Sequence, residues 1–293
     1  MRLGSSTSYG ADYHAVPGIT KIQNLTYYGT GTGMFYGLTQ LTTLNNVNFT
    51  FNGSMVRFFS NCESLATFTN VSFAMNQYKS VTNMELGCYW AKQLPEKIRR
   101  TLLLTYASKA SENTSITSIR NLFRNANGVS WSYGPTASEL TAAGGKLTLE
   151  LIDKYALAPS LTEAYAAFGN SKLTKITGKP FIYCSELSSI KGLCNENSSF
   201  ADITELGLEG ITCDYVDASW AFYATGITKL PTTLFKQGYE GPKVEASRMF
   251  GKCYSLTTIG NFLNTGGNFI EMDYMFYNDN NITTDFTKEL PYD

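Results

Sequence analysis

Several short stretches of the chain carry an apolar residue at every third position, with Ser and Thr in most of the gaps. The clearest copy is "FGKCYSLTTI", in which Phe250, Cys253, Leu256 and Ile259 recur at this spacing. Residues at i and i+3 share one face of a helical turn. The spacing therefore predicts a short helical turn in each copy.

A second pattern follows the first. In "TTLNNVNF" and "ATFTNVSF" the apolar residues alternate with polar ones, which predicts short strands with one buried face. The alternating residues are Val47, Phe49, Val71 and Phe73. Asparagines are expected where the chain bends, at Asn46, Asn70 and Asn261.

The combined pattern repeats along the chain. Phe35 and Phe59 are 24 residues apart, and Phe250 and Phe276 are 26 apart. Such a period is the signature of a solenoid, because one unit cannot bury its apolar edge alone and stacked units can. We therefore predict a shared core in which equivalent residues lie in register. Its members are Phe35, Leu38, Leu41, Phe59, Cys62, Leu65, Phe181, Cys184, Leu187, Phe250, Cys253 and Leu256.

The motif resembles the BspA-like leucine-rich repeats, a bacterial-surface subclass. Three stretches carry the resemblance: Met34-Phe35, Phe58-Phe59-x-x-Cys62-x-Ser64-Leu65 and Met249-Phe250-x-x-Cys253-x-Ser255-Leu256-Thr257. Clear matches cover residues 33–74 and 160–290. The resemblance implies an α/β repeat solenoid with short strands and short helical turns, and adhesion or binding at a surface. Such repeats also resemble parts of phage particles that infect gut bacteria.

The predicted organisation is an N-terminal cap or arm at 1–32, a solenoid at 33–290 and a short tail at 291–293. The middle, about 85–160, matches poorly and is expected to be an irregular helical insertion, with a helix after Pro95. Phe168 and Phe181 are only 13 residues apart, so both cannot open full repeats. A right-handed parallel β-helix is the competing fold, and the spacing of three favours the leucine-rich solenoid.

Composition narrows the function classes. The net charge is -1 and 16% of the 293 residues are charged, against about 25% in typical domains. Without a basic face, nucleic acid is not an expected partner. No apolar run approaches the roughly 20 residues of a membrane span. The start of the sequence does not read as a secretory signal, which favours assembly in the cytoplasm.

Metal and cofactor chemistry has little support. The six cysteines form no C-x-x-C motif, and His14 is the only histidine. Cys62, Cys184 and Cys253 share the repeat position and are expected to be buried thiols. A Cys184–Cys194 disulfide is the alternative. We predict no cofactor and no metal ion.

No catalytic residue is predicted, because His14 has no partner motif for nucleophilic catalysis. Carboxylates do gather near Tyr215 and Trp220, and this mixture could handle a carbohydrate. They are Asp202, Glu205, Glu209, Asp214 and Asp217. A solvated acidic rim on one turn of the solenoid is the favoured interpretation.

The sequence therefore predicts a non-enzymatic binding or structural protein, most of all a phage virion component such as a fibre, tail or capsid-decorating protein. Its expected partners are other virion or surface proteins, within an oligomer or larger assembly. The alternative is a bacterial cell-surface adhesin that binds host protein or glycan, and a glycan-degrading virion protein ranks third. Polar positions between the anchors are the candidate partner-binding surface: Thr42, Asn45, Thr67, Ser188, Tyr254 and Thr257.

Overall fold

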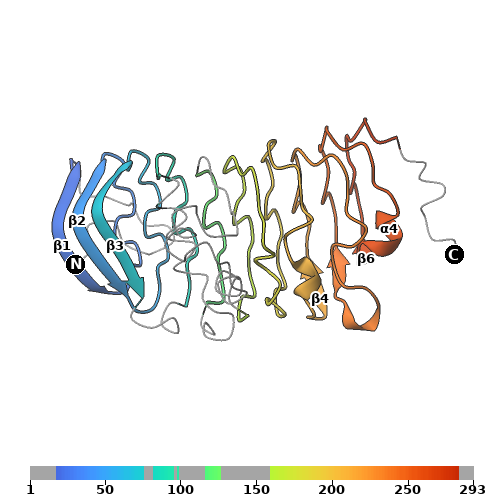
Figure 1. The fold of residues 1–293 in the computed structure, drawn as a ribbon, viewed down its shortest axis with the longest axis horizontal. Helices are drawn as coiled ribbons and strands as arrows, with labels where there is room; N and C mark the ends of the chain where they lie inside the picture. The colour runs from blue at the N-terminus through green and yellow to red at the C-terminus, as the bar shows by residue number, and fades with distance from the viewer. Residues whose placement is uncertain (1–17, 76–81, 96–97, 99–115, 127–158, 284–293) are drawn as a thin grey trace, which may run out of the picture.

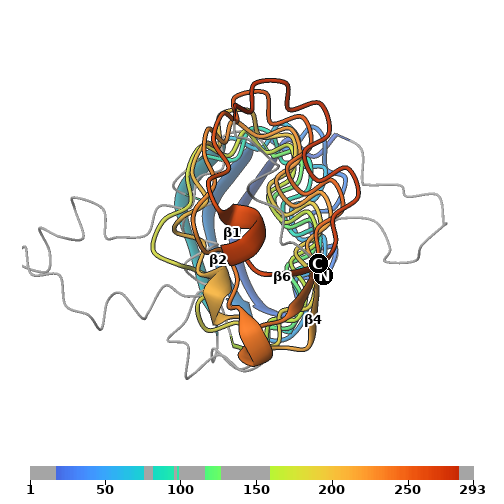
Figure 2. The ribbon, with the colours of Figure 1, turned by 90° about the vertical axis from the view of Figure 1, so that its right-hand side faces the viewer.

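The structure, a computed structural model, describes residues 18–75, 82–95, 98, 116–126 and 159–283. These residues form an elongated parallel β-solenoid of about 8 turns with little helix (Figure 1). Seen along the long axis, successive coils overlie one another around one core (Figure 2). The predicted repeat solenoid is confirmed, and its form supports the parallel β-helix that the sequence left as the competing fold.

One wall of the solenoid is a hydrogen-bonded ladder, whose rungs are seven-residue segments. In each rung but the last, alternate backbone N–H groups donate to carbonyls of the next rung or of the residue just before it. Met55, Arg57 and Phe59, for example, donate to Asn83, Glu85 and Gly87 over 2.7 to 2.9 Å. The rungs are residues 31–37, 55–61, 84–90, 119–125, 164–170, 190–196, 218–224, 246–252 and 272–278.

Each rung is built from β-turns rather than from helix. The N–H of Cys62 donates to the carbonyl of Phe59, and Asn61 between them has a positive φ of 59°. The bond from Cys253 to Phe250 encloses Lys252, which has a φ of 60°. A positive φ at the third residue is typical of a type II turn. The prediction of a short helical turn is therefore wrong here, although the three-residue spacing does reflect an i to i+3 hydrogen bond.

Two small parallel sheets form near the two ends of the solenoid. In each of their coils the strand comes just before the ladder rung in the chain. The N-terminal sheet pairs β1 (Lys21–Gly29), β2 (Thr43–Phe51) and β3 (Thr67–Met75) in that order. Asn24, Asn46 and Asn70 interrupt these strands with φ of 50° to 55°, and Asn46 donates to Asn24 at 2.8 Å. The predicted strands and the bends at Asn46 and Asn70 are thus confirmed.

The C-terminal sheet pairs β4 (Tyr215–Asp217), β5 (Lys243–Glu245) and β6 (Asn268–Glu271). Short helical elements accompany it: the 3₁₀ turns η1 (Leu208–Gly210) and η2 (Gly238–Glu240), and α4 (Phe262–Thr265). Asn261 precedes α4, with a φ of -91°. Every strand pair in both sheets is parallel, as a coil that returns to its start requires.

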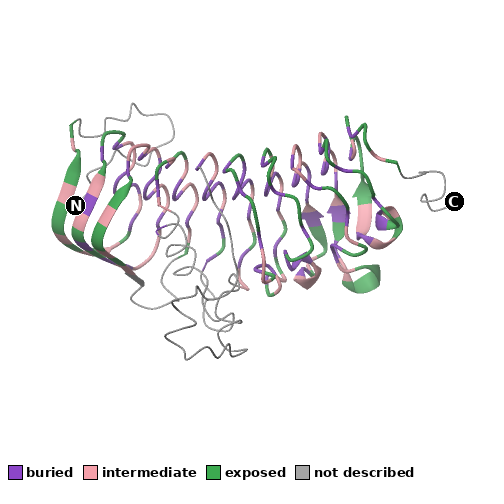
Figure 3. Ribbon diagram, turned by 45° about the horizontal axis from the view of Figure 1, so that its top comes forward, coloured by how far each residue is buried: buried purple, intermediate pink, exposed green. Residues whose placement is uncertain are grey.

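The core is one continuous cluster along the axis (Figure 3). All twelve residues of the predicted repeat core are buried. Phenylalanine rings of adjacent rungs stack: Phe35 on Phe59 at 5.5 Å between centroids, and Phe222 on Phe250 at 5.6 Å. Stacked apolar side chains thus supply the burial that no single coil could achieve.

Phe181 does not share the position of Phe59 and Phe250, so that part of the predicted register is wrong. On the ladder, Phe168 donates its N–H to Leu193, whereas Phe181 donates to Leu206 on another wall. The 13-residue spacing arises because both phenylalanines belong to one coil. Cys184 follows Phe181 and therefore lies on that other wall as well.

Two stretches within the predicted insertion, residues 84–90 and 119–125, are regular rungs. Ile98, within the helix expected after Pro95, is buried, as is Leu94 just before it, and the rest of that expected helix lies outside the described residues. His14 and most of the predicted N-terminal arm also lie outside them. All six cysteines are free thiols, and five are buried, Cys213 being partly exposed.

Candidate recognition surface

Polar side chains fix the start of the ladder by accepting backbone hydrogen bonds. Asn83, Ser118 and Asp217 each accept the N–H of the residue two positions later, over 2.7 to 3.2 Å. This local bond is the usual reason for Asn, Ser and Asp at turns. These recurring bonds therefore hold the backbone in place where the rungs begin, and with it the outward side chains of those rungs.

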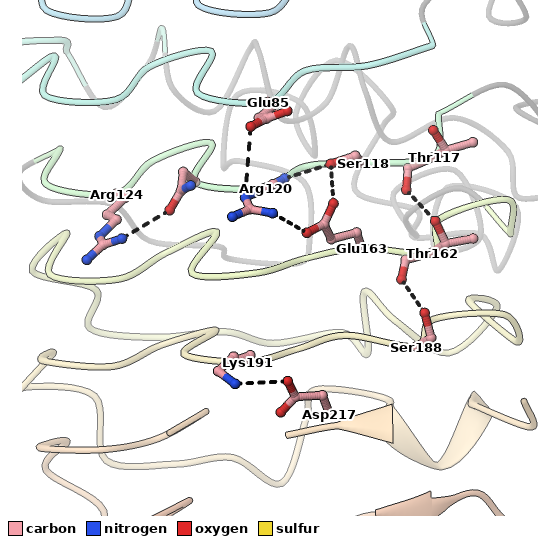
Figure 4. A network of polar contacts seen from close by, with 11 residues as sticks. Glu85, Thr117, Ser118, Arg120, Arg124, Thr162, Glu163, Ser188, Lys191 and Asp217 are labelled. Atoms are coloured by element: carbon pink, nitrogen blue, oxygen red, sulfur yellow. Dashed lines mark hydrogen bonds and ion pairs between the residues drawn. The ribbon is translucent and has the colours of Figure 1, made fainter. Parts of the chain in front are cut away.

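Charged side chains of neighbouring rungs are also paired along this line (Figure 4). Arg120 Nη1 donates to Glu163 at 3.1 Å, and Arg120 Nε lies 3.9 Å from Glu85. Lys191 pairs with Asp217 at 3.1 Å. Because these pairs are solvent-accessible, each contributes little to stability. The five groups are three carboxylates and two cations, so these pairs leave an excess of one negative charge.

The predicted partner-binding residues lie mostly at the surface, but several are used between coils. Thr42 Oγ1 donates to Thr20 O at 3.0 Å, and Thr257 Oγ1 donates to Thr228 O at 3.2 Å. Ser188 makes the same bond to the preceding coil (Figure 4). Thr42, Thr67, Ser188, Tyr254 and Thr257 are exposed and Asn45 is half-buried. They are spread along the axis, and their role in binding stays a prediction.

Aromatic and cationic side chains gather on the last three rungs. We name this set the C-terminal patch: Trp220, Tyr223, Arg248, Lys252, Tyr274 and Tyr277. Similar pairs occur singly elsewhere, with Arg57 over Tyr36 and Arg120 over Tyr165. The patch differs because three consecutive rungs contribute to it.

Arg248 lies between two rings in this patch. Its guanidinium carbon is 4.8 Å from the ring centroid of Trp220 and 5.1 Å from that of Tyr274. The three residues occupy the same left-handed position on successive rungs, with φ of 60°, 55° and 56°. Because rungs are only about 4.8 Å apart, a planar side chain can stack against both neighbours.

A second column runs beside the first. Tyr223, Gly251 and Tyr277 occupy equivalent positions, and a Cβ at residue 251 would lie 3.1 Å from the Tyr223 ring. Glycine thus leaves room for the rings on either side. Lys252 lies 5.5 Å from the Tyr223 centroid, and its hydrogen bond with Tyr223 raises the pKa of Lys252. The patch therefore keeps its positive charge at neutral pH.

The acidic cluster of the sequence is dispersed by the fold. Glu205 accepts the N–H of Gly178, Glu209 pairs with Lys179, and Asp217 pairs with Lys191. Asp202 accepts the N–H and hydroxyl of Thr204. These carboxylates have structural contacts, and Asp214 alone of the predicted five lines the cleft beside β4.

Across the described ranges, no group of three or more His, Cys, Asp or Glu side chains is placed to hold a metal ion. Within the same residues, no helix has the length and apolarity needed to cross a membrane. No protein-family model, curated protein or solved structure matches the chain, so the resemblance to BspA-like repeats stays a prediction.

The sequence carries a signal for the C-terminal patch that the apolar spacing alone did not reveal. Trp220, Arg248 and Tyr274 each stand two residues before a core phenylalanine, and Tyr223 and Tyr277 each follow one. Equal offsets from equivalent anchors place side chains in one column of a solenoid. The three phenylalanines are Phe222, Phe250 and Phe276.

Proposed function

We propose that the chain is a non-enzymatic binding protein that uses the C-terminal patch to contact a protein partner. The observation that carries the proposal is Arg248 held between Trp220 and Tyr274. The few residues that dominate binding energy at protein interfaces are enriched in Arg, Trp and Tyr. Stacking orders the arginine before a partner arrives, which lowers the entropy cost of binding.

Exposure supports the same interpretation. Tyr274 is 63% and Tyr277 is 44% exposed, so two rings remain available after the packing within the patch. Tyr254, one of the predicted partner-binding residues, is 57% exposed and acts electrostatically on Lys252. The patch thus extends to a residue that sequence analysis selected independently.

A photo-crosslinker at position 277 tests the proposal. It should capture one protein from purified phage particles or bacterial surface fractions, and that protein is then purified. Against it, the double variant Arg248→Ala/Tyr274→Ala should bind at least about 30-fold more weakly, as expected for removing an interface hot spot of about 2 kcal/mol.

The matched control is Tyr36→Ala/Arg57→Ala, which removes a similar pair at the other end of the solenoid. Arg57 and Arg248 both have positive φ, so any backbone effect of alanine is the same in the two variants. The control should bind within about threefold of the wild type, an ordinary effect for residues outside a hot spot. Equal affinity of both variants would show that the patch is not the interface.

For the setting of this function we propose a phage virion component, with a bacterial surface adhesin as the alternative. The support is the sequence resemblance and the low charge, which suits a protein held by many neighbours. Mass spectrometry should detect the chain in purified phage particles at a fixed ratio to a capsid protein. Its recovery only in bacterial surface fractions would favour the adhesin.

A further inference from the structure

A cleft of about 800 Å³ lies against the C-terminal sheet, away from the ladder. Tyr215 of β4, Lys243 of β5 and Asn268 of β6 are paired neighbours on its floor. Tyr239 of η2 and Asp214 complete its main walls. The volume falls within the range of about 300 to 1,000 Å³ that small-molecule sites occupy.

Hydrogen bonds within the protein hold the walls of this cleft in place without a ligand. Asn268 donates to the carbonyls of Gly238 and Gly241 over 3.0 and 3.1 Å, and its Oδ1 accepts the N–H of Gly238. A Cβ at Gly241 would lie 1.8 Å from Lys236 O, so the turn requires glycine there. Three hydrogen bonds from one side chain thus hold the η2 wall against β6.

The aromatic floor is fixed as well. The hydroxyl of Tyr215 donates to the carboxylate of Glu245, and this bond raises the pKa of Tyr215 above its ordinary value. The ring is 42% exposed, so one face remains open to the cleft. Tyr239 is fully exposed at the opposite wall.

Two opposite charges in the cleft are available to a ligand. Among the described residues, neither the Asp214 carboxylate nor the Lys243 ammonium has a side-chain hydrogen bond or ion pair. One carboxylate and one ammonium together carry no net charge, so they do not select for a phosphorylated or strongly anionic ligand. They suit a neutral ligand rich in hydroxyl groups, which can donate to the first and accept from the second.

We propose that this cleft binds a neutral saccharide unit. The apolar C–H face of a sugar ring stacks on Tyr215, with Tyr239 at the edge, while ring hydroxyls bond to Asp214 and Lys243. Phe269 and Ile270 close the apolar side. The proposal does not depend on the protein partner of the C-terminal patch, because none of that patch lines the cleft.

The test uses the full chain and the methyl glycosides of glucose, galactose, mannose and N-acetylglucosamine, with glucose 6-phosphate and sialic acid as anionic probes. Saturation-transfer NMR should show binding of at least one neutral glycoside, and neither anionic probe should compete. Asp214→Asn and Lys243→Met should each weaken that binding at least tenfold.

Tyr239→Ala is the variant that keeps the test independent of folding, because this side chain is fully exposed. It should also weaken binding, with an unchanged thermal midpoint. Asp273→Asn, which changes an exposed carboxylate on the ladder, is the matched control and should bind as the wild type does. The proposal is overturned if no neutral glycoside binds, if only the anionic probes bind, or if the cleft variants bind like the control.

Discussion

Removal of the Asn197 side chain tests the internal hydrogen bonding of the solenoid. Asn197 is 1% exposed and accepts the N–H groups of Ser171 and Leu173 over 3.0 and 2.8 Å. It also donates to Phe168 O and Cys194 O over 2.8 and 2.9 Å. One side chain thus connects the loop after one rung to the rung of the next coil.

The loss of unfolding free energy in Asn197→Ala depends on which of the groups bonded to Asn197 keep another hydrogen-bond partner. Phe168 O still accepts the hydroxyl of Ser171 at 2.6 Å. The two N–H groups and Cys194 O lose the bonds described for them, and each unsatisfied buried group costs about 1 to 3 kcal/mol. We therefore expect these three groups together to cost roughly 3 to 9 kcal/mol, a large part of a typical total stability of about 5 to 15 kcal/mol.

Urea unfolding monitored by circular dichroism measures this loss, and hydrogen exchange locates it. Exchange should accelerate at residues 168–173 and 190–197 first, because a repeat solenoid couples mainly nearest neighbours. The control is Asn48→Ala, which removes an exposed asparagine with one bond to Ser72 and should cost less than about 1 kcal/mol. A loss below 1 kcal/mol for Asn197→Ala would refute the reasoning.

Three further predictions concern other parts of the molecule. Leu256→Ala should lower the free energy of unfolding in urea by about 2 to 5 kcal/mol. Thr257→Arg, at an exposed site with one hydroxyl bond to Thr228, should leave the thermal midpoint nearly unchanged. A large drop in that midpoint would show that the Thr257 side chain lies inside. Burial raises the pKa of Asp279 from 3.8 to about 7, so the folded state binds the proton more tightly than the unfolded state, and stability should fall as pH rises from about 4 to 7; Asp279→Asn should remove that slope. In the native protein, iodoacetamide should label Cys213 before any other thiol, because the remaining five are buried, and equal labelling by mass spectrometry would contradict the burial.

The sequence predicted the stacked repeat, but the local backbone could not be read from its spacing alone. A helical turn and a β-turn both bring residues i and i+3 together. They differ in the sign of φ at the third residue, and Gly37, Asn61 and Asn125 occupy that position within the ladder with φ of 58° to 75°. Glycine and asparagine tolerate this conformation best, so their recurrence was the signal for turns.

Two rungs depart from the apolar motif for a physical reason. Three residues after Phe168 and Phe222, where the motif has a cysteine, the chain has Ser171 and Thr225. Their buried hydroxyls donate to the carbonyls of Phe168 and Phe222 over 2.6 and 2.8 Å. A hydrogen bond therefore replaces apolar contact at that position, which a search for apolar spacing cannot find.

The cleft could not be predicted from local pattern, because its parts meet only through parallel pairing. Tyr215 and Glu245 are 30 residues apart, as are Gly238 and Asn268. The sequence did identify Asp214 and Tyr215 as part of an acidic and aromatic stretch. It could not show that Glu209 and Asp217 form ion pairs with lysines, whereas Asp214 forms none with any residue that the structure describes.

A row of carboxylates lies between the cleft and the C-terminal patch. This negative charge argues that the two sites bind different ligands. Along each of the last three coils the chain passes from the cleft to one carboxylate and then directly into a ladder rung. Those carboxylates, Asp217, Glu245 and Glu271, are paired neighbours across β4, β5 and β6. An anionic polymer that covered both the cleft and the C-terminal patch would have to cross this row and would be repelled. A protein on the patch and a neutral saccharide in the cleft avoid it, and because both sites are built on the same coils, their relative placement is fixed by the backbone ladder itself.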